Sequence, residues 1–335
     1  ILDRFGLPLN AGERECFVTL SVGVALYPAE DCDLDALLKR ADIAMRSARA
    51  WGENSVQQYS SAACEPQSER LALKNGLREA LARGQLFIEY QPQVDLATRC
   101  IVGVEALLRW QHPVYGRIDP GRFIPLAEET GMIVPIGDWV LRTACAQNRA
   151  WRDAGLPGVK TAVNLSARQL RHPDFAARVL EIVQGEALPR GCVDLEITEG
   201  ILIDDLDANR QVMGALRAAG VLVSIDDFGT GYSSLNYLSE LPVDILKMDG
   251  LFVRRLGGSA RARPYAIAEA IVAMAHRLEL KVIAECVETL EQLGDLGAMR
   301  CDEAQGYLFH RPLLAEQVGA LLARQADQQA ALAPA

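Results

Sequence analysis

An alternation of short apolar runs with helical patterns constrains the fold of this chain more than any other feature. From residue 70 onward the sequence has eight such runs, rich in Val, Ile and Leu as buried strands are. Between most of them, apolar residues recur at helical spacing, which predicts helices over 135–154, 174–185, 207–219 and 265–278. The eight runs are 86–90, 101–105, 160–164, 193–197, 221–226, 245–248, 281–285 and 305–309.

Eight buried strands separated by helices over about 250 residues are typical of a (β/α)8 barrel. An open doubly wound sheet is the competing α/β architecture. No G-x-G-x-x-G or G-x-x-x-x-G-K-[ST] follows any of the runs, so the usual nucleotide signature of that sheet is missing. We therefore expect a TIM-like barrel over residues 70–325, followed by a C-terminal tail at 326–335.

The first 60 residues have a different pattern. Residues 17–25 are rich in β-branched and small side chains and predict a strand. Apolar positions at helical spacing predict a helix over 34–50, with Gly52 just past its end. Polar residues follow, so we interpret 1–60 as a partial α/β fragment and 61–69 as a linker.

Charge and hydropathy exclude two classes of partner. The formal net charge is −10 and no dense Lys/Arg run is present, which argues against binding of DNA or RNA polymers. No apolar run is long enough to span a bilayer and no signal peptide opens the sequence, so we expect no membrane contact from this segment. The chain begins at Ile1 rather than Met, and we expect it to be a piece of a longer protein.

The cysteines predict a reducing compartment. None of the eight forms a C-x-x-C pair, and their spacing fits neither a disulfide framework nor a zinc ribbon. Reduced thiols packed as small apolar groups in a cytoplasmic protein are the simplest interpretation. The cysteines are Cys16, Cys32, Cys64, Cys100, Cys145, Cys192, Cys286 and Cys301.

Oxygen-bearing side chains recur where the apolar runs end. In a barrel these ends meet on one face, where active sites form. Carboxylates gathered there would raise one another's pKa unless a cation joined them, and carboxylate and amide oxygens suit Mg²⁺ or Mn²⁺. Lys247 lies within the sixth run and Gln305 opens the eighth. The strand-end residues are Glu105, Asn164, Glu196, Asp226 and Glu285.

Two adjacent acids, Asp226 and Asp227, are the sharpest local feature. Neighbouring carboxylates at a strand end can serve two metal ions at the spacing that in-line phosphoryl displacement uses. The alternative is a turn carrying two solvated acids before Gly229 and Gly231. The four histidines fall outside the strand-end set, and we interpret them as surface or packing residues: His112, His172, His276 and His310.

The segment Glu105-Ala106-Leu107 resembles the signature of EAL-domain cyclic di-GMP phosphodiesterases. The resemblance covers about residues 70–322 and rests on an ordered set of motifs, which is far more specific than the tripeptide. The others are YQP at 90–92, FIPLAE at 123–128, NLS at 164–166, LEITE at 195–199, DDFGTG at 226–231, LKMD at 246–249, AECVE at 284–288 and QGY at 305–307.

The resemblance implies hydrolysis of cyclic di-GMP to linear pGpG by a (β/α)8 barrel whose first strand runs antiparallel to the others. It implies Lys247 as the residue that orients the attacking water, Glu288 as support for the second metal, and Glu199 as the anchor of the loop 226–234. The implied ligands of one metal are Glu105, Asn164, Glu196 and Asp226; those of the second are Asp226, Asp227 and Glu285. The implied contacts to the dinucleotide are Gln91, Leu108, Arg109, Lys247 and Gln305.

One position departs from the family pattern. Cys286 stands where the family usually has Gly, directly after the expected ligand Glu285. Cysteine is small, so we expect it to be tolerated. A thiol beside a metal ligand would also be able to bind a soft ion or become oxidised.

The N-terminal stretch resembles the last third of a GGDEF diguanylate cyclase domain, through VTLSVGV at 18–24 and RADIAM at 40–45. The segment that carries cyclase chemistry in that family lies upstream of this region. We therefore expect residues 1–60 to have no cyclase activity of their own, and we note departures from the family pattern at Arg46, Ala50 and Trp51.

Two other functions compete with the phosphodiesterase. A catalytically inactive EAL domain would bind cyclic di-GMP as a receptor, but such domains lose ligands from the strand-end set, which is complete here. A protein-interaction platform would not explain the ordered ligands. The resemblance also implies a homodimer formed through the EAL domain.

Overall fold

The computed structural model describes residues 9–11, 14–16, 20–26, 34–51, 56–58, 67–203, 205–229, 238, 240–257 and 262–332. The chain divides into two compact units, Ile1–Asn75 and Gly76–Ala335, and the division falls inside helix α3 (Gln67–Ala80). Residues 67–69, which we interpreted as the end of a linker, are therefore helical.

The first unit contains a strand–helix–strand arrangement. Strands β3 (Val22–Val24) and β4 (Val56–Gln58) pair in parallel, and helix α2 (Leu34–Trp51) lies between them in sequence. Strands β1 (Leu9–Ala11) and β2 (Arg14–Cys16) form a separate antiparallel pair. The helix predicted over 34–50 is confirmed. Of the strand predicted over 17–25, only residues 22–24 are a strand; residues 20, 21 and 25 are irregular, and 17–19 lie outside the described residues.

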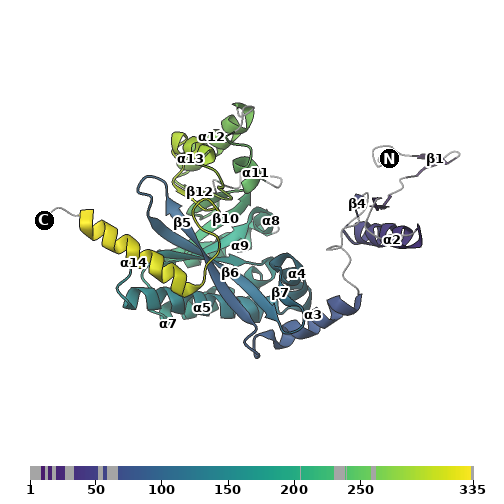
Figure 1. The fold of residues 1–335 in the computed structure, drawn as a ribbon, viewed down its shortest axis with the longest axis horizontal. Coiled ribbons are helices and arrows are strands. Elements are labelled where there is room, and N and C mark those ends of the chain that lie inside the picture. The colour runs from purple at the N-terminus through teal and green to yellow at the C-terminus, as the bar shows by residue number, and fades with distance from the viewer. Residues whose placement is uncertain are drawn as a thin grey trace. The chain divides into compact units, whose positions relative to one another are not determined.

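The second unit is the predicted (β/α)8-type barrel (Figure 1). The sheet closes because the first barrel strand, β5 (Leu86–Asp95), pairs with β6 (Ile101–His112) on one side and with β13 (Glu303–Ala304) on the other. Both of these pairings are antiparallel and the remaining barrel pairings are parallel, as the resemblance implied. The barrel strands are β5 (Leu86–Asp95), β6 (Ile101–His112), β8 (Lys160–Leu165), β9 (Val193–Thr198), β10 (Leu222–Phe228), β11 (Ile245–Met248), β12 (Lys281–Ala284) and β13 (Glu303–Ala304).

The position predicted for the eighth strand, 305–309, is wrong. Strand β13 comprises Glu303 and Ala304, and the chain turns immediately after Gln305. Gly306 allows that turn: a Cβ there would lie 2.1 Å from the carbonyl oxygen of Val287 and 2.3 Å from its nitrogen. The apolar residues at 307–309 belong to this turn, and their run has the composition of a strand without its hydrogen bonds.

The four predicted helices are confirmed, and several others surround the barrel. Helix α14 (Ala315–Leu332) continues through most of the segment 326–335, which we expected to be a tail. None of the described helices is both long and apolar enough to cross a membrane. Outside the barrel strands the unit contains β7 (Gly116–Ile118), α4 (Pro120–Thr130), α5 (Ile133–Asp153), α6 (Ala167–Leu170), α7 (Phe175–Gly185), α8 (Glu199–Ile203), α9 (Leu206–Ala219), α11 (Gly250–Val253), α12 (Ala262–Arg277), α13 (Leu290–Ala298) and α14 (Ala315–Leu332).

Polar side chains fill much of the barrel interior. Branched apolar residues usually fill this space in a (β/α)8 barrel. Here, below the strand ends, the Lys160 ammonium pairs with the Glu303 carboxylate, and the Ser224 hydroxyl donates to Asp194 (2.6 Å to Oδ1). All four residues are buried. Burial of such groups is tolerable only because each has a partner.

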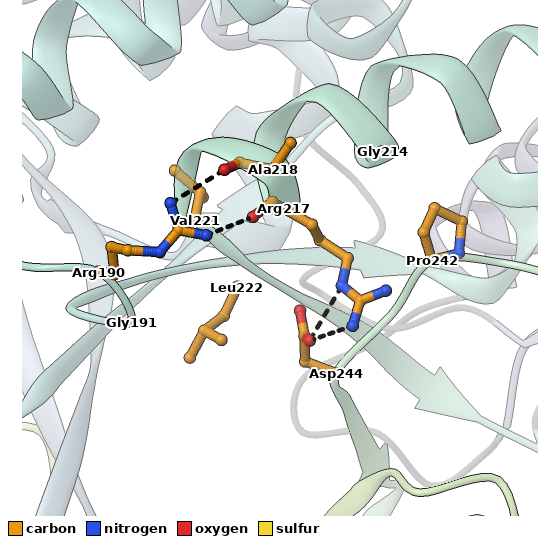
Figure 2. Close-up of a pocket in the computed structure, with 10 residues that line it drawn as sticks. Arg190, Gly191, Gly214, Arg217, Ala218, Val221, Leu222, Pro242 and Asp244 are labelled. Atoms are coloured by element: carbon orange, nitrogen blue, oxygen red, sulfur yellow. Dashed lines mark hydrogen bonds and ion pairs between the residues drawn. The ribbon is translucent and has the colours of Figure 1, made fainter.

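A cavity of about 650 Å³ lies near the N-terminal ends of strands β10 and β11 (Figure 2). Arg190 donates to the carbonyl oxygens of Ala218 (2.9 Å) and Arg217 (3.3 Å) at the end of helix α9. Arg217 pairs with Asp244 at 2.8 Å. Both guanidinium groups therefore stabilise the scaffold at the face opposite the predicted active site.

Gly306→Ala should lower the free energy of unfolding by about 1–3 kcal/mol, because the added methyl group would collide with the Val287 backbone. Gly294→Ala, in the exposed interior of helix α13 with nothing within 4 Å of the added carbon, is the control. It should leave stability unchanged or raise it by up to about 1 kcal/mol. Urea unfolding of both variants measures the difference, and equal stabilities would contradict the role of Gly306.

Candidate active site

The barrel brings the predicted strand-end residues together on one face. Glu105 lies on β6, Asn164 on β8, Glu196 on β9 and Asp226 on β10, while Glu285 directly follows β12. Register explains the convergence, since Asn164 lies opposite Glu196 and successive inward-facing residues of parallel strands share a layer.

Lys247 on β11 is the centre of the cluster. Its side chain is fully buried, and its ammonium nitrogen lies 2.7 Å from Glu285 Oε1, 2.8 Å from Glu196 Oε2 and 3.1 Å from Asp226 Oδ1. Glu105 Oε2 is farther away, at 3.8 Å. One buried cation therefore serves four carboxylates.

The carboxylates compete for this single positive charge. Burial, together with neighbouring acids, raises the pKa of Glu285 to about 7 and the pKa of Glu196 well above its usual value, although Lys247 opposes both shifts. Burial also acts to raise the pKa of Glu105, but Lys247, Gln305 and Asn164 together bring it below its usual value. Burial would lower the pKa of Lys247, and the surrounding carboxylates instead raise it. The cluster has room for more positive charge.

Amide side chains fix the orientation of Glu105. Asn164 Nδ2 donates to its Oε1 (2.7 Å) and Gln305 Nε2 donates to its Oε2 (2.6 Å). Gln305 also donates to Gln91 Oε1 (3.1 Å) and accepts from Gln93 (3.1 Å). Gln91 in turn donates to the His310 carbonyl oxygen at 3.1 Å. Gln305 therefore orients the Glu105 carboxylate directly, and Gln91 does so through its hydrogen bond with Gln305.

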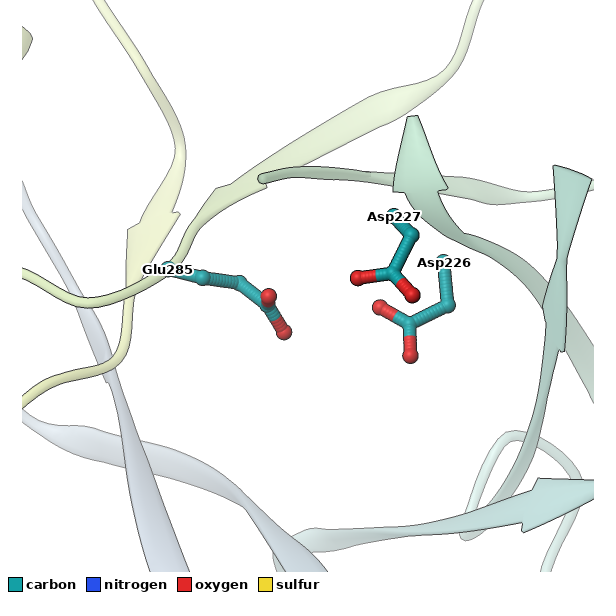
Figure 3. Close-up of side chains that lie close together, drawn as sticks. All are labelled: Asp226, Asp227 and Glu285. Atoms are coloured by element: carbon teal, nitrogen blue, oxygen red, sulfur yellow. The ribbon is translucent and has the colours of Figure 1, made fainter. Parts of the chain in front are cut away.

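A β-bulge lets both members of the aspartate pair reach the site. Successive side chains of a regular strand point to opposite faces, so Asp226 and Asp227 could not both face the cluster. The pairing of β10 with β11 shifts between Ile225 and Phe228, and Asp227 has a φ of 54°. Its carboxylate thus turns toward Asp226 and Glu285, and one oxygen from each lies within 4.8 Å of the others (Figure 3).

The cluster fits divalent metal ions. Its donors are carboxylate and amide oxygens, which hard cations prefer. Glu196 Oε1 is buried and has no hydrogen-bond partner among the described residues, an arrangement expected of a metal ligand. Asp226, Asp227 and Glu285 offer a further set of oxygens close enough to share an ion.

Glu199 contacts the chain that follows the aspartate pair. It begins helix α8, is buried, and accepts a hydrogen bond from the Gly229 backbone N–H at Oε2 (3.1 Å). The contact is consistent with an anchoring role. Residues 230–234 of the expected loop lie outside the described residues.

Two cavities adjoin the cluster. One, of about 490 Å³, is lined by Glu105, Asp226, Glu285, Cys286, Glu288, Gln91, Gln305, Gly306, Arg254 and Tyr307. The other, of about 410 Å³, is largely apolar and includes Leu108, Arg109, Asn164 and Ser166. Sequence reasoning did not select Arg254, Tyr307 or Ser166. Arg254 directly follows the short helix α11, and Tyr307 lies in the turn after strand β13. Neither residue ends a strand, so a search for polar residues at strand ends could not reveal them.

Cys286 occupies a strained position beside the cluster. Its φ is 56°, a conformation that glycine adopts without strain, and the residue as a whole is exposed although its sulfur is partly buried. Burial of the sulfur and the nearby Glu285 carboxylate raise the pKa of this thiol. The group is therefore a neutral thiol at neutral pH rather than an activated nucleophile.

The chain belongs to the EAL domain family, which it matches over residues 74–312. Residues 1–55 match the diguanylate cyclase GGDEF domain. Both matches agree with the resemblances found in the sequence.

Several relatives in this family are named as cyclic di-GMP enzymes. The bifunctional diguanylate cyclase/cyclic di-GMP phosphodiesterase MucR of Pseudomonas aeruginosa is 42% identical over 323 residues, covering 96% of this chain and 47% of that protein. The cyclic di-GMP phosphodiesterase NbdA of the same species is 41% identical over 93% of this chain and 40% of its own length. This chain therefore spans less than half the length of either relative.

A solved structure supports the barrel assignment. The PaMucR phosphodiesterase in complex with c-di-GMP has a TM-score of 0.70 and 46% identity, covering 74% of this chain and 99% of that one. The EAL domain of Mycobacterium smegmatis DcpA has a TM-score of 0.61 and 37% identity, covering 72% of this chain and 97% of its own.

Lys247→Met should lower the free energy of unfolding of the metal-free protein by about 3–5 kcal/mol, because it leaves buried carboxylates without their cation. Added Mn²⁺ should return part of this loss by binding the folded state. Lys281→Met, whose side chain is 65% exposed, is the matched control and should change stability by no more than about 0.5 kcal/mol. Equal stability of the two variants in denaturant unfolding would contradict this account.

Proposed function

We propose that this chain hydrolyses cyclic di-GMP to linear pGpG, using two divalent cations to activate the water that attacks one phosphodiester bond. The observation that carries the proposal is the cluster of acids around Lys247 at the strand ends. Membership of the EAL family and the activities named for its relatives supply the reaction class.

The charge of the cluster supports two metal ions. The carboxylates of Glu105, Glu196, Asp226, Asp227 and Glu285 carry five negative charges when ionised, and Lys247 returns one. The net charge of about −4 that remains would be balanced by two divalent cations. Such ions would also neutralise the phosphates of a substrate that an acidic protein otherwise repels.

We assign one cation to Glu105, Asn164, Glu196 and Asp226, and the second to Asp226, Asp227 and Glu285. Mg²⁺ or Mn²⁺ suits these oxygen donors. Glu288 lines the same cavity and would support the second ion through its water ligands. Bound there, the ions would supply a water of lowered pKa and charge compensation for the phosphate.

The protein's own groups would orient the reactants. Lys247 lies among the oxygens of three proposed ligands. Once cations share these oxygens, its ammonium would be free to orient the attacking water and to stabilise negative charge on the phosphate. Leu108 and Arg109 border the apolar cavity, whose lining suits a flat guanine base. Gln91 and Gln305 border the other cavity and would contact the dinucleotide while holding Glu105.

The competing proposal is a receptor that binds cyclic di-GMP without turnover. The complete ligand set favours the enzyme, because a receptor has no need of a metal-bound water. The protein is proposed to act in the cytoplasm as a homodimer formed through its EAL domain.

Glu105→Gln and Asp226→Asn should each abolish hydrolysis, because each substitution replaces a charged ligand in a cluster that acts as a unit. Chromatography of cyclic di-GMP incubated with Mg²⁺ or Mn²⁺ measures pGpG formation. Asp153→Asn changes an exposed acid that pairs only with Arg149 among the described residues, and it should retain full activity. Tight binding of cyclic di-GMP by the unaltered chain, without metal-dependent turnover, would select the receptor instead.

Glu199→Ala should lower kcat/KM about tenfold, since it removes a buried, charged acceptor from the Gly229 N–H. Glu199→Gln keeps an acceptor oxygen and should retain most of the activity. Steady-state kinetics at saturating Mn²⁺ compares the two variants, with unfolding measured in parallel. Unchanged kinetics in Glu199→Ala would exclude the anchoring role.

A further inference from the structure

A buried carboxylate outside the metal cluster holds two arginines. Glu89 Oε2 accepts from Arg109 Nε at 2.8 Å and from Arg117 Nη2 at 2.6 Å. The side chains of Glu89 and Arg109 are each 11% exposed, whereas that of Arg117 is 53% exposed. These contacts connect the neighbouring strands β5, β6 and β7.

Strand register brings the three charged groups to one face. Phe87 lies opposite Arg109 across β5 and β6, and Glu89 is two residues farther along the same face as Phe87. Arg117 lies opposite Gln111, which is two residues from Arg109. The Arg117 guanidinium also lies over the Phe87 ring, 5.9 Å from its centroid.

The arrangement keeps a positive charge beside the substrate cavity. The two guanidinium groups and the one carboxylate together carry a net charge of about +1. Burial acts to raise the pKa of Glu89, but the hydrogen bonds from Arg117 and Arg109 bring it below its usual value, so the carboxylate is ionised at neutral pH. Arg117 thus prevents Glu89 from fully neutralising Arg109.

The orientation of Arg109 is fixed from two sides. Glu89 holds its Nε, and its Nη1 donates to the Leu108 carbonyl oxygen at 3.0 Å. Among the described residues, Nη2 has no hydrogen-bond partner. Arg109 borders the cavity of about 410 Å³ that also includes Asn164, a proposed metal ligand.

We infer that Glu89 and Arg117 are positioning residues that set Arg109 to bind a phosphate group of the dinucleotide. Glu89 fixes the direction of the guanidinium, and Arg117 preserves its net charge. The inference rests on the proposed function, because it assigns Arg109 to an anionic substrate. Neither positioning residue touches the reacting atoms, so both act on substrate affinity rather than on the chemical step.

Steady-state kinetics of Glu89→Gln tests the inference. KM for cyclic di-GMP should rise about tenfold, the size expected for loss of one charge-assisted hydrogen bond, while kcat stays within about twofold. Arg117→Gln should also raise KM, because Glu89 then neutralises Arg109. Glu79→Gln removes an exposed acid that pairs with Arg83 and should leave both parameters unchanged.

A double-mutant cycle separates positioning from a general structural role. In an Arg109→Gln background, Glu89→Gln should raise KM by less than about twofold, since the group it positions is absent. Equal effects of Glu89→Gln with and without Arg109, or a fall in kcat with KM unchanged, would overturn the inference. If the unaltered chain fails to hydrolyse cyclic di-GMP, the proposed function fails instead, and the two failures are thereby distinguished.

Discussion

The buried ammonium of Lys247 is the contact on which the rest of the site depends. It lies within 3.1 Å of oxygens from three carboxylates that come from three different strand ends. Without it, these acids would repel one another across the barrel. With it alone, they remain undercompensated, as the raised pKa values of Glu196 and Glu285 indicate. Lys247 therefore offsets enough of the repulsion between the acids for them to be buried together in the folded barrel. The cluster can still bind further cations.

The polar interior is possible because apolar packing lies outside it. Buried residues such as Leu195, Ile197 and Leu246 alternate along the strands with the inward-facing charges. Each strand thus carries charge on one face and hydrophobic surface on the other, and the helices cover the second face (Figure 1). Burial of apolar side chains between the strands and the surrounding helices therefore stabilises a barrel whose charged interior would not form on its own.

The sequence predicted the elements, and the strand-end residues that the barrel brings together, because both depend on local pattern. Seven of the eight apolar runs correspond to strands, and the end of each run that carries a proposed ligand reaches the common face. The prediction of a strand at the eighth run was wrong because composition does not reveal backbone hydrogen bonding. The residues of this run form a turn that Gly306 permits. Glu89 lies inside a run rather than at its end. Its importance comes from pairing across β5, β6 and β7, which no single-strand pattern contains.

Backbone geometry divides the proposed ligands into two groups. Glu105 and Glu196 lie on regular strands that pair with a neighbour on each side, and Asn164 lies on a regular strand opposite Glu196. Asp227 lies in a bulge with positive φ, and Glu285 lies past the end of β12, followed by Cys286, which also has positive φ. Conformations of this kind persist only where surrounding contacts enforce them. The proposed first metal site would therefore rest mainly on paired barrel strands, whereas the proposed second site would depend on contacts such as that between Glu199 and Gly229. Changes near this loop would then act on the second ion first.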